Sequence, residues 1–375
     1  MKRKNLSNSF YQEELRGLSQ LENCLITATE SNLKSILSLI LNSKMIFDNS
    51  KIYGLFKLFL IIVQIRPNIT ELVAEIILQL YEKNIFIDDF LKTILENPTF
   101  KYFVYQLYKR EIVSIEHIID NLNNNPDLFL YFAPEIIENN PTFYNDNIRL
   151  TNKCNYNYDP NTHCERRELG INDSEVALAI RNDDIDKLKE IISKNAININ
   201  EFLIEPSFFE KAVFVNRPLR MIDYSAYFCS NKCFDFFIEY GMNVTQSTIQ
   251  YAIAGGNESI INKYKDNNPS LLNSSILNTS IQFHRYNICK HLIDFGLIHE
   301  NVDTFTTCIY SHNTTSLLNF LKIIDVNAKN SNIYFYLMEF ILFIFNTFTL
   351  RYSSTKPFIC SNYLFFTKNR YKYKR

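Results

Sequence analysis

The stretch Asp223–Gly241, "DYSAYFCSNKCFDFFIEYG", contains two short apolar segments separated by a polar break at Cys229. In the second segment apolar residues recur every three to four positions, which is the period of an amphipathic α-helix. Gly241 then suits the left-handed cap with which many helices end. The stretch therefore predicts two short helices joined by a tight turn, a unit too small to bury its apolar faces alone.

The same pattern recurs through residues 171–330, where each polar break separates a first helix from a second. The breaks of the five units fall near Asp183, Cys229, Gly256, His284 and His312. The last four breaks are 27, 28 and 28 residues apart, whereas 46 residues separate the first two and add the insert "NAININEFLIEPSFFEKAVFVNRP". Self-similarity at this period is typical of stacked repeats, in which neighbouring units bury each other's faces. We expect an all-α chain with a helical repeat solenoid over these residues.

The pair Gly255-Gly256, within "YAIAGGNESI", also resembles the glycine-rich loops that hold phosphate groups. Such a loop needs an upstream strand and a lysine or a wider glycine spacing, and this stretch has neither. We predict instead that Gly256 ends the first helix in a left-handed conformation. Asn257 would then cap the next helix, as Asp184 would in the first unit.

The units resemble the ankyrin repeat, which has small residues in its first helix, paired apolar residues in its second and a final glycine. Ser225-Ala226, Phe237-Ile238 and Gly241 follow that pattern, and "DVNAKN", Asp325–Asn330, resembles the finger after an ankyrin helix pair. Together with "AIRNDDIDKLKEII" and "YAIAGGNESII", they resemble a group of protist ankyrin-repeat proteins with an uncharacterised ankyrin-like domain ahead of ordinary repeats. The resemblance implies protein–protein interaction and carries over no catalytic residue.

Two features depart from the ankyrin pattern. No unit begins with Thr-Pro-Leu-His, and the period is shorter than the usual ~33 residues, so a turn would replace the finger between units. The residues expected at structural positions of the repeat are Ala226, Gly241, Gly255, Gly256, Asn257, Gly296, Asp325 and Asn327.

Residues 1–165 indicate an irregular helical region ahead of the repeats. "YGLFKLFLIIVQI" is apolar for too few residues to span a bilayer and predicts a buried helix. "TNKCNYNYDPNTHCERRELG" has almost no apolar periodicity, which favours a linker or a long loop. Its Cys154, His163 and Cys164 lack the close cysteine pair and the fourth ligand of a structural zinc site, so we expect no metal there.

Residues 331–375 form an apolar and basic tail that departs from the repeat pattern, with no acidic residue after Glu339. Three interpretations remain open: a shifted reading frame that truncates the array, a C-terminal cap, or a membrane anchor over residues 333–350. Glu339 argues against the anchor, because a carboxylate in the middle of a span is costly in lipid.

Composition narrows the function classes. The 375 residues carry a formal net charge of -1, which makes no case for nucleic acid or an anionic membrane as a partner. Seven glycines are few for a P-loop enzyme, a Rossmann enzyme or an all-β fold. The basic start lacks the apolar core of a signal peptide, and the eight cysteines include no CxxC pair, so a cytoplasmic protein with free thiols is expected.

These observations predict a non-enzymatic scaffold or adaptor that binds other proteins, with no cofactor, no nucleic acid and no small-molecule substrate. The alternative is a membrane-tethered ankyrin adaptor anchored by residues 333–350. Binding is expected on the concave side of the stack, at the exposed face of the first helices and at the loop tips. These tips lie near Met242–Gln246, Asp266–Pro269 and Leu297–Asp303.

Overall fold

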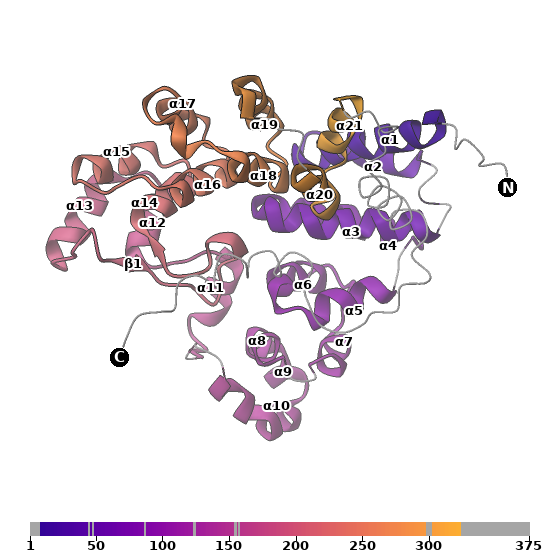
Figure 1. Cartoon of the computed structure of the whole chain (residues 1–375). Coiled ribbons are helices and arrows are strands. Elements are labelled where there is room, and N and C mark those ends of the chain that lie inside the picture. The colour runs from indigo at the N-terminus through magenta and orange to yellow at the C-terminus, as the bar shows by residue number, and fades with distance from the viewer. Residues whose placement is uncertain are drawn as a thin grey trace.

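Helices dominate the structure of this chain, as the sequence predicts. A computed structural model describes residues 8–43, 46, 49–85, 88–122, 125–153, 156, 158–297 and 302–323. In this part of the chain the only strands are β1 (Leu203–Ile204) and β2 (Leu219–Arg220), which pair antiparallel with Leu203 opposite Arg220. The all-α class is therefore confirmed (Figure 1).

Five helical hairpins follow one another from residue 175 to residue 323. Within each hairpin the first helix packs against the second, and each first helix also packs against the first helix of the next hairpin. Figure 1 shows this hairpin row along the upper part of the molecule, from α12 and α13 at one end to α20 and α21 at the other. The helices are α12 (Glu175–Arg181), α13 (Ile185–Lys194), α14 (Met221–Tyr227), α15 (Asn231–Glu239), α16 (Gln246–Gly255), α17 (Glu258–Asn267), α18 (Ser274–Gln282), α19 (Tyr286–Leu292), α20 (Val302–Tyr310) and α21 (Thr314–Ile323), with short helices η5 (Val213–Val215), η6 (Pro269–Leu271) and η7 (Ile293–Leu297) between them.

Each hairpin turns at a residue in the left-handed backbone region. The φ angles are 52° at Asp183, 58° at Cys229, 87° at Gly256, 48° at His284 and 52° at His312. These are the five positions at which the sequence pattern puts its breaks. Only glycine adopts this conformation at little cost, so contacts around the turns must stabilise the other four residues.

The residue after each of the last four turns binds the preceding hairpin. Its side chain donates a hydrogen bond to a carbonyl near the end of the preceding first helix. Such carbonyls have no partner within their own helix. The bonds join Ser230 to Ile180, Asn257 to Ala226 (3.5 Å), Arg285 to Ala254 (2.6 Å) and Asn313 to Ile281 (2.8 Å). This ladder fixes the hairpins against one another in addition to their shared apolar core.

The insert between the first two hairpins covers the inner face of the row. Phe214 of η5 packs against Tyr227, Tyr251 and Phe283, with ring centroids 6.0, 4.9 and 4.7 Å away. Those three residues belong to or directly follow consecutive first helices, and every residue of α14 is buried. The expectation that the first helices expose a binding face is therefore wrong for α14, because the insert packs on it.

The N-terminal region continues the row and then returns to its start. Helix α1 packs against α21, and α1–α4 lie at that end of the row in Figure 1, with α5–α10 below them. Lys211 of the insert comes within 3.8 Å of Glu71 in α4. The regions on the two sides of residue 165 thus share extensive contacts. The helices are α1 (Asn8–Ile26), α2 (Leu33–Leu41), α3 (Asn49–Ile65), η2 (Pro67–Ile69), α4 (Thr70–Tyr81), α5 (Asp88–Glu96), η3 (Pro98–Phe100), α6 (Lys101–Tyr108), α7 (Ile115–Asp120), α8 (Pro126–Tyr131), α9 (Ala133–Asn139), α10 (Pro141–Asn147), η4 (Ile148–Lys153) and α11 (His163–Leu169).

The predicted linker is packed over residues 158–170, which contain α11. His163 and Arg167 are buried, and both bind the carbonyl of Tyr131, at 3.0 and 2.7 Å. Arg167 also forms an ion pair with Glu135. The linker expectation is wrong here, because polar side chains with buried partners leave no apolar period in the sequence. Burial lowers the pKa of His163 to about 4, so this ring packs in its neutral form.

One membrane-related feature appears within the described residues. No single helix is both long and apolar enough to cross a membrane. The pair Ile52–Ile65 and Pro67–Tyr81 passes that test jointly, by length and composition, although its two parts are bent by 118°. The proposed anchor, residues 333–350, lies outside the described residues.

Candidate functional site

The glycine pair and its neighbours hold two hairpins together. Ala226 is fully buried in α14. A Cβ atom at Gly255 would lie 1.9 Å from the carbonyl oxygen of Tyr227, so only glycine permits this approach of α16 to α14. Asn257 accepts a bond from the Ile260 amide at 3.2 Å and so caps α17. Gly255 and Asn257 therefore serve the packing of the two hairpins and the start of α17.

Two further predicted repeat positions, Gly241 and Gly296, lie after the second helices of their hairpins. Gly241 and Gly296 have φ angles of 86° and 74°, and both are exposed. Asp325 and Asn327 lie outside the described residues. Of the three predicted loop tips, residues 242–246 are described in full. Arg220 donates to the Asn243 carbonyl at 3.2 Å and to the Thr245 hydroxyl at 3.1 Å, and so holds this tip.

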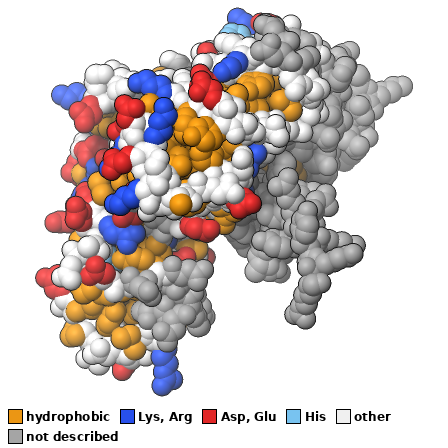
Figure 2. Space-filling model, turned by 90° about the vertical axis from the view of Figure 1, so that its left-hand side faces the viewer, with side chains coloured by type: hydrophobic (Ala, Val, Ile, Leu, Met, Phe, Trp, Pro, Cys, Tyr) orange, Lys and Arg blue, Asp and Glu red, His pale blue; other side chains and the backbone are white. Residues whose placement is uncertain are grey.

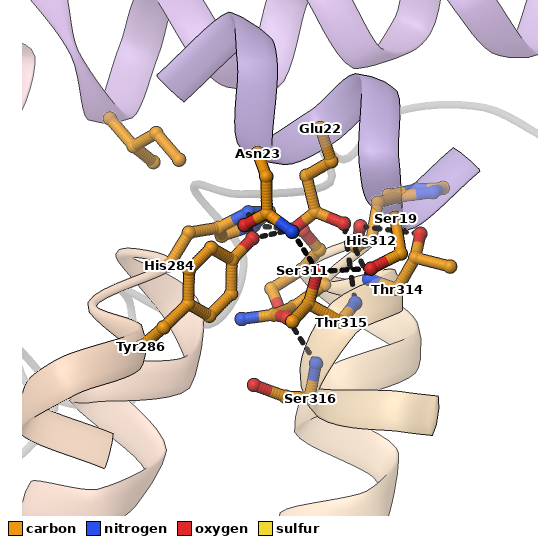
Figure 3. Close-up of polar contacts among 12 residues, drawn as sticks. Ser19, Glu22, Asn23, His284, Tyr286, Ser311, His312, Thr314, Thr315 and Ser316 are labelled. Carbon is orange, nitrogen blue, oxygen red and sulfur yellow. Dashed lines mark hydrogen bonds and ion pairs between the residues drawn. The ribbon is translucent and has the colours of Figure 1, made fainter. Parts of the chain in front are cut away.

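A buried carboxylate joins α1 to the last hairpin, at what we call the closed end of the row. Glu22 of α1 is fully buried. One of its oxygens accepts from the amides of Thr314 and Thr315, at 2.9 and 3.3 Å, and the other accepts from the Tyr286 hydroxyl. The free N–H groups at a helix N-terminus favour a negative charge, here at the start of α21. Figure 3 shows Glu22 pointing from α1 into this cluster.

His284 completes the contacts of Glu22. Its two ring nitrogens face oxygens: Nδ1 lies 2.5 Å from the carboxylate, and Nε2 lies 2.9 Å from the carbonyl of Ser311. The ring thus lies between an oxygen of the carboxylate and a backbone carbonyl. Ser19 adds a hydroxyl contact with Thr315 at 2.6 Å. The cluster therefore uses the polar groups of Glu22 to bind other parts of the same chain.

Burial changes the ionisation of neighbouring groups at the closed end. Burial, with the nearby Glu22 charge as a second cause, raises the pKa of Tyr286 and keeps its hydroxyl a donor. Burial also lowers the pKa of Lys57 in α3 to about 7. The pKa of His312 is lowered well below its usual value by burial and then by the Lys57 charge. The closed end thus contains several partly buried ionisable groups whose pKa values burial shifts.

A groove of about 1140 Å³ lies at the other end of the row, which we call the open end. The first hairpin, α11 and the segment 201–208 line it, and Phe202, Leu203 and Phe208 supply apolar surface that is not fully buried. Figure 2 looks onto the side of the molecule where α13, α15 and β1 lie. It shows hydrophobic side chains grouped there among acidic and basic ones.

The charges that line the groove are unbalanced. Arg166 is occupied by Asp173, with bonds of 2.6 and 2.9 Å. Glu175, Glu201 and Glu205 are exposed, and none of them has an ion-pair partner within the described part of the chain. An incoming group therefore meets three carboxylates without paired cations.

Buried hydrogen bonds hold the wall of the groove in place. Glu210 is buried, accepts from the amides of Asn172 and Ala212 at 2.9 and 2.8 Å, and pairs with Arg181 of α12. Asn172 in turn donates to the carbonyl of Glu205 at 2.8 Å. Sequence reasoning missed these residues, because Arg181 lies in α12, Glu210 lies within the insert 29 residues later, and neither belongs to a motif.

Neither a metal-binding cluster nor a known relative points to a further site among the described residues. Among the described residues, no three His, Cys, Asp or Glu side chains gather so that they could hold a metal ion. Of the suggested trio, His163 is buried against Tyr131, Cys164 is exposed, and Cys154 lies outside the described residues. In comparisons with known proteins, no family model, no curated protein and no solved structure matches the chain.

Proposed function

We propose that this chain is a non-enzymatic, ankyrin-like scaffold that binds another protein at the open end of its hairpin row. The groove at that end carries the proposal. Partly exposed apolar side chains lie there beside unpaired carboxylates, on a wall fixed by buried bonds. Protein interfaces commonly combine an apolar centre with a polar rim.

The ankyrin-like part of the proposal rests on the regularity of the row. Four of its turns follow one another at 27 or 28 residues, each with a left-handed residue. Side chains that follow these turns bind back to the preceding hairpin. Stacked repeats of this kind commonly act as binding surfaces rather than as catalysts.

Affinity capture with the full-length chain tests the proposal. We expect partners that wild-type protein retains and Leu203→Asp loses, because Leu203 lines the groove and is 41% exposed. Leu169→Asp is the matched control, since Leu169 is 51% exposed but does not line the groove. Each partner is then purified and its affinity measured with all three proteins. If folded wild-type protein enriches no partner, or if both variants retain every partner, the proposal is wrong.

A further inference from the structure

The groove also indicates what kind of partner it fits. We infer that it takes a peptide segment of another protein in which apolar side chains alternate with lysine or arginine. This inference rests on the proposed function and adds the chemistry of the partner. The argument depends on the apolar surface of the groove, on its charge and on the rigidity of its wall.

The apolar surface provides anchoring sites. Leu203 is 41% exposed, and Phe202 and Phe208 on either side of it are partly exposed. A groove of about 1140 Å³ is large enough for several side chains of a peptide. Apolar and aromatic anchors in such grooves usually contribute most of the binding energy.

The charge selects which peptides can use those anchors. Any partner that covers Glu175, Glu201 and Glu205 removes water from three carboxylates, and the cost is large unless cations replace the water. Arg166 is already paired with Asp173, whose two oxygens accept bonds from its Nε and one Nη nitrogen. Lysine or arginine on the partner offsets this cost and also speeds association. An acidic segment or a nucleic acid would instead be repelled.

Buried bonds hold the backbone of the wall that carries these groups. Glu205 is tied through its carbonyl to Asn172, whose amide binds the buried Glu210. Glu175 begins α12, whose Arg181 pairs with the same Glu210. A fixed arrangement loses little conformational entropy on binding, which favours specific recognition.

Three synthetic peptides of one length test the inference with the full-length chain. They share the same Leu and Val positions and carry Lys, Ser or Glu at every other position. We expect the Lys peptide to bind at least ~10-fold more tightly than the Ser peptide, and the Glu peptide not to bind. The affinity of the Lys peptide should also fall as the salt concentration rises, because salt screens the attraction between its lysines and the groove carboxylates. Fluorescence anisotropy measures all three.

A charge-reversed variant gives the sharper result. Glu175→Lys/Glu201→Lys/Glu205→Lys should weaken the Lys peptide at least ~10-fold and should gain binding of the Glu peptide. The matched control reverses three exposed acids outside the groove, Glu30→Lys/Glu239→Lys/Glu258→Lys. This control has the same net charge as the groove variant, and its Glu258 lies in the first turn of a helix, as Glu175 does. We expect it to bind as wild type does.

Other outcomes would overturn the inference about the peptide without overturning the proposed scaffold function. If all three peptides bind equally and Leu203→Asp abolishes binding, the groove has no charge preference, and only the scaffold proposal stands. If none binds, Lys368→Gln/Arg370→Gln/Lys372→Gln/Lys374→Gln in the full chain tests the basic end of the same chain. Lys-peptide binding by that variant alone would assign the groove to the chain's own tail. If neither the wild-type protein nor the tail variant binds the Lys peptide, the inference is also overturned. The affinity capture of partners would still test the scaffold proposal.

Discussion

The carboxylates at the two ends of the hairpin row differ in burial and in their partners. At the closed end Glu22 is fully buried, and both of its oxygens accept hydrogen bonds from the last two hairpins. At the open end Glu175, Glu201 and Glu205 are exposed and lack ion-pair partners among the described residues. A helical row has two end faces that need covering or a polar surface. Here α1 covers one face, and the other keeps a charged groove.

This difference separates stability from binding. A buried carboxylate that loses its partners is expensive, so the closed end should respond strongly to substitution. Exposed carboxylates interact mostly with water, so their replacement should change stability little. For the binding of a partner at the open end we expect the opposite order: substitutions at the open end should weaken binding strongly, and substitutions at the closed end should affect it little. The following predictions test this contrast.

The largest effect is expected for Glu22→Ala. The substitution removes the acceptor for the Thr314 and Thr315 amides and leaves His284 without its carboxylate. We expect a loss of about 3–5 kcal/mol in the free energy of unfolding, as for a broken buried pair. Urea unfolding measures it. Glu30→Ala, in the exposed loop after α1, should stay within about 0.5 kcal/mol of wild type. A loss below ~1 kcal/mol for Glu22→Ala would contradict the claim that Glu22 is a buried carboxylate that joins α1 to the last hairpins.

Equivalent caps in the first and last hairpins provide a second comparison. Asn313 is buried, caps α21 through the Ser316 amide at 2.8 Å and binds the carbonyl of Ile281. Asp184 is exposed, and its side chain caps α13 through the Lys187 amide at 2.9 Å. We expect Asn313→Ala to cost about 2–3 kcal/mol, from the cap and a second buried bond together. Asp184→Ala should cost about 1 kcal/mol. Equal losses would show that the ladder between hairpins adds nothing.

The pH dependence of stability should report Lys57 at the closed end. Its pKa is about 7 when folded, against 10.5 for an ordinary lysine. Between these values the unfolded chain binds more protons, so stability rises as the pH increases from 7 to 9. One group contributes at most about 1.4 kcal/mol per pH unit. Lys57→Met should remove this contribution and flatten the curve. Exposed Lys92→Met should leave the slope unchanged. Identical slopes for all three proteins would argue against a buried Lys57.

The smallest change in stability is expected at the open end. Glu175→Lys/Glu201→Lys/Glu205→Lys should shift the free energy of unfolding by less than about 1.5 kcal/mol in total, as expected for three exposed surface substitutions. Thermal and urea unfolding measure it. A loss as large as that of Glu22→Ala would mean that these carboxylates have structural roles, and the contrast between the two ends would fail.

The sequence predicts those features that depend on near neighbours. The turn at Gly256 and the cap at Asn257 lie within four residues of the groups they serve, and so does the Asp184 cap. The buried helix over residues 53–65 follows from its apolar content, and α3 confirms it. Local spacing is sufficient for these features, because backbone geometry fixes which groups meet within one or two helical turns.

Contacts between distant segments could not be predicted from the sequence. Glu22 meets Tyr286 and Thr314 across 264 and 292 residues, and no pattern in the sequence distinguishes it from the other acidic residues of α1. His163 and Arg167 are polar residues in a polar stretch, yet buried partners fold that stretch against α8 and α9. Phe214 belongs to an insert outside the repeat period. In each case the decisive partner comes from the tertiary fold.

A double-mutant cycle between Glu22 and Tyr286 tests the central claim, which is that α1 packs on the last hairpins and covers the closed end of the row. Glu22→Ala, Tyr286→Phe and the double variant are compared with wild type by urea unfolding. Residues so distant in sequence are coupled only if they touch in the fold. We predict a coupling energy of about 1–3 kcal/mol, as for residues that share one buried network. Effects that add to within about 0.5 kcal/mol would mean that α1 does not pack there, and would contradict the account.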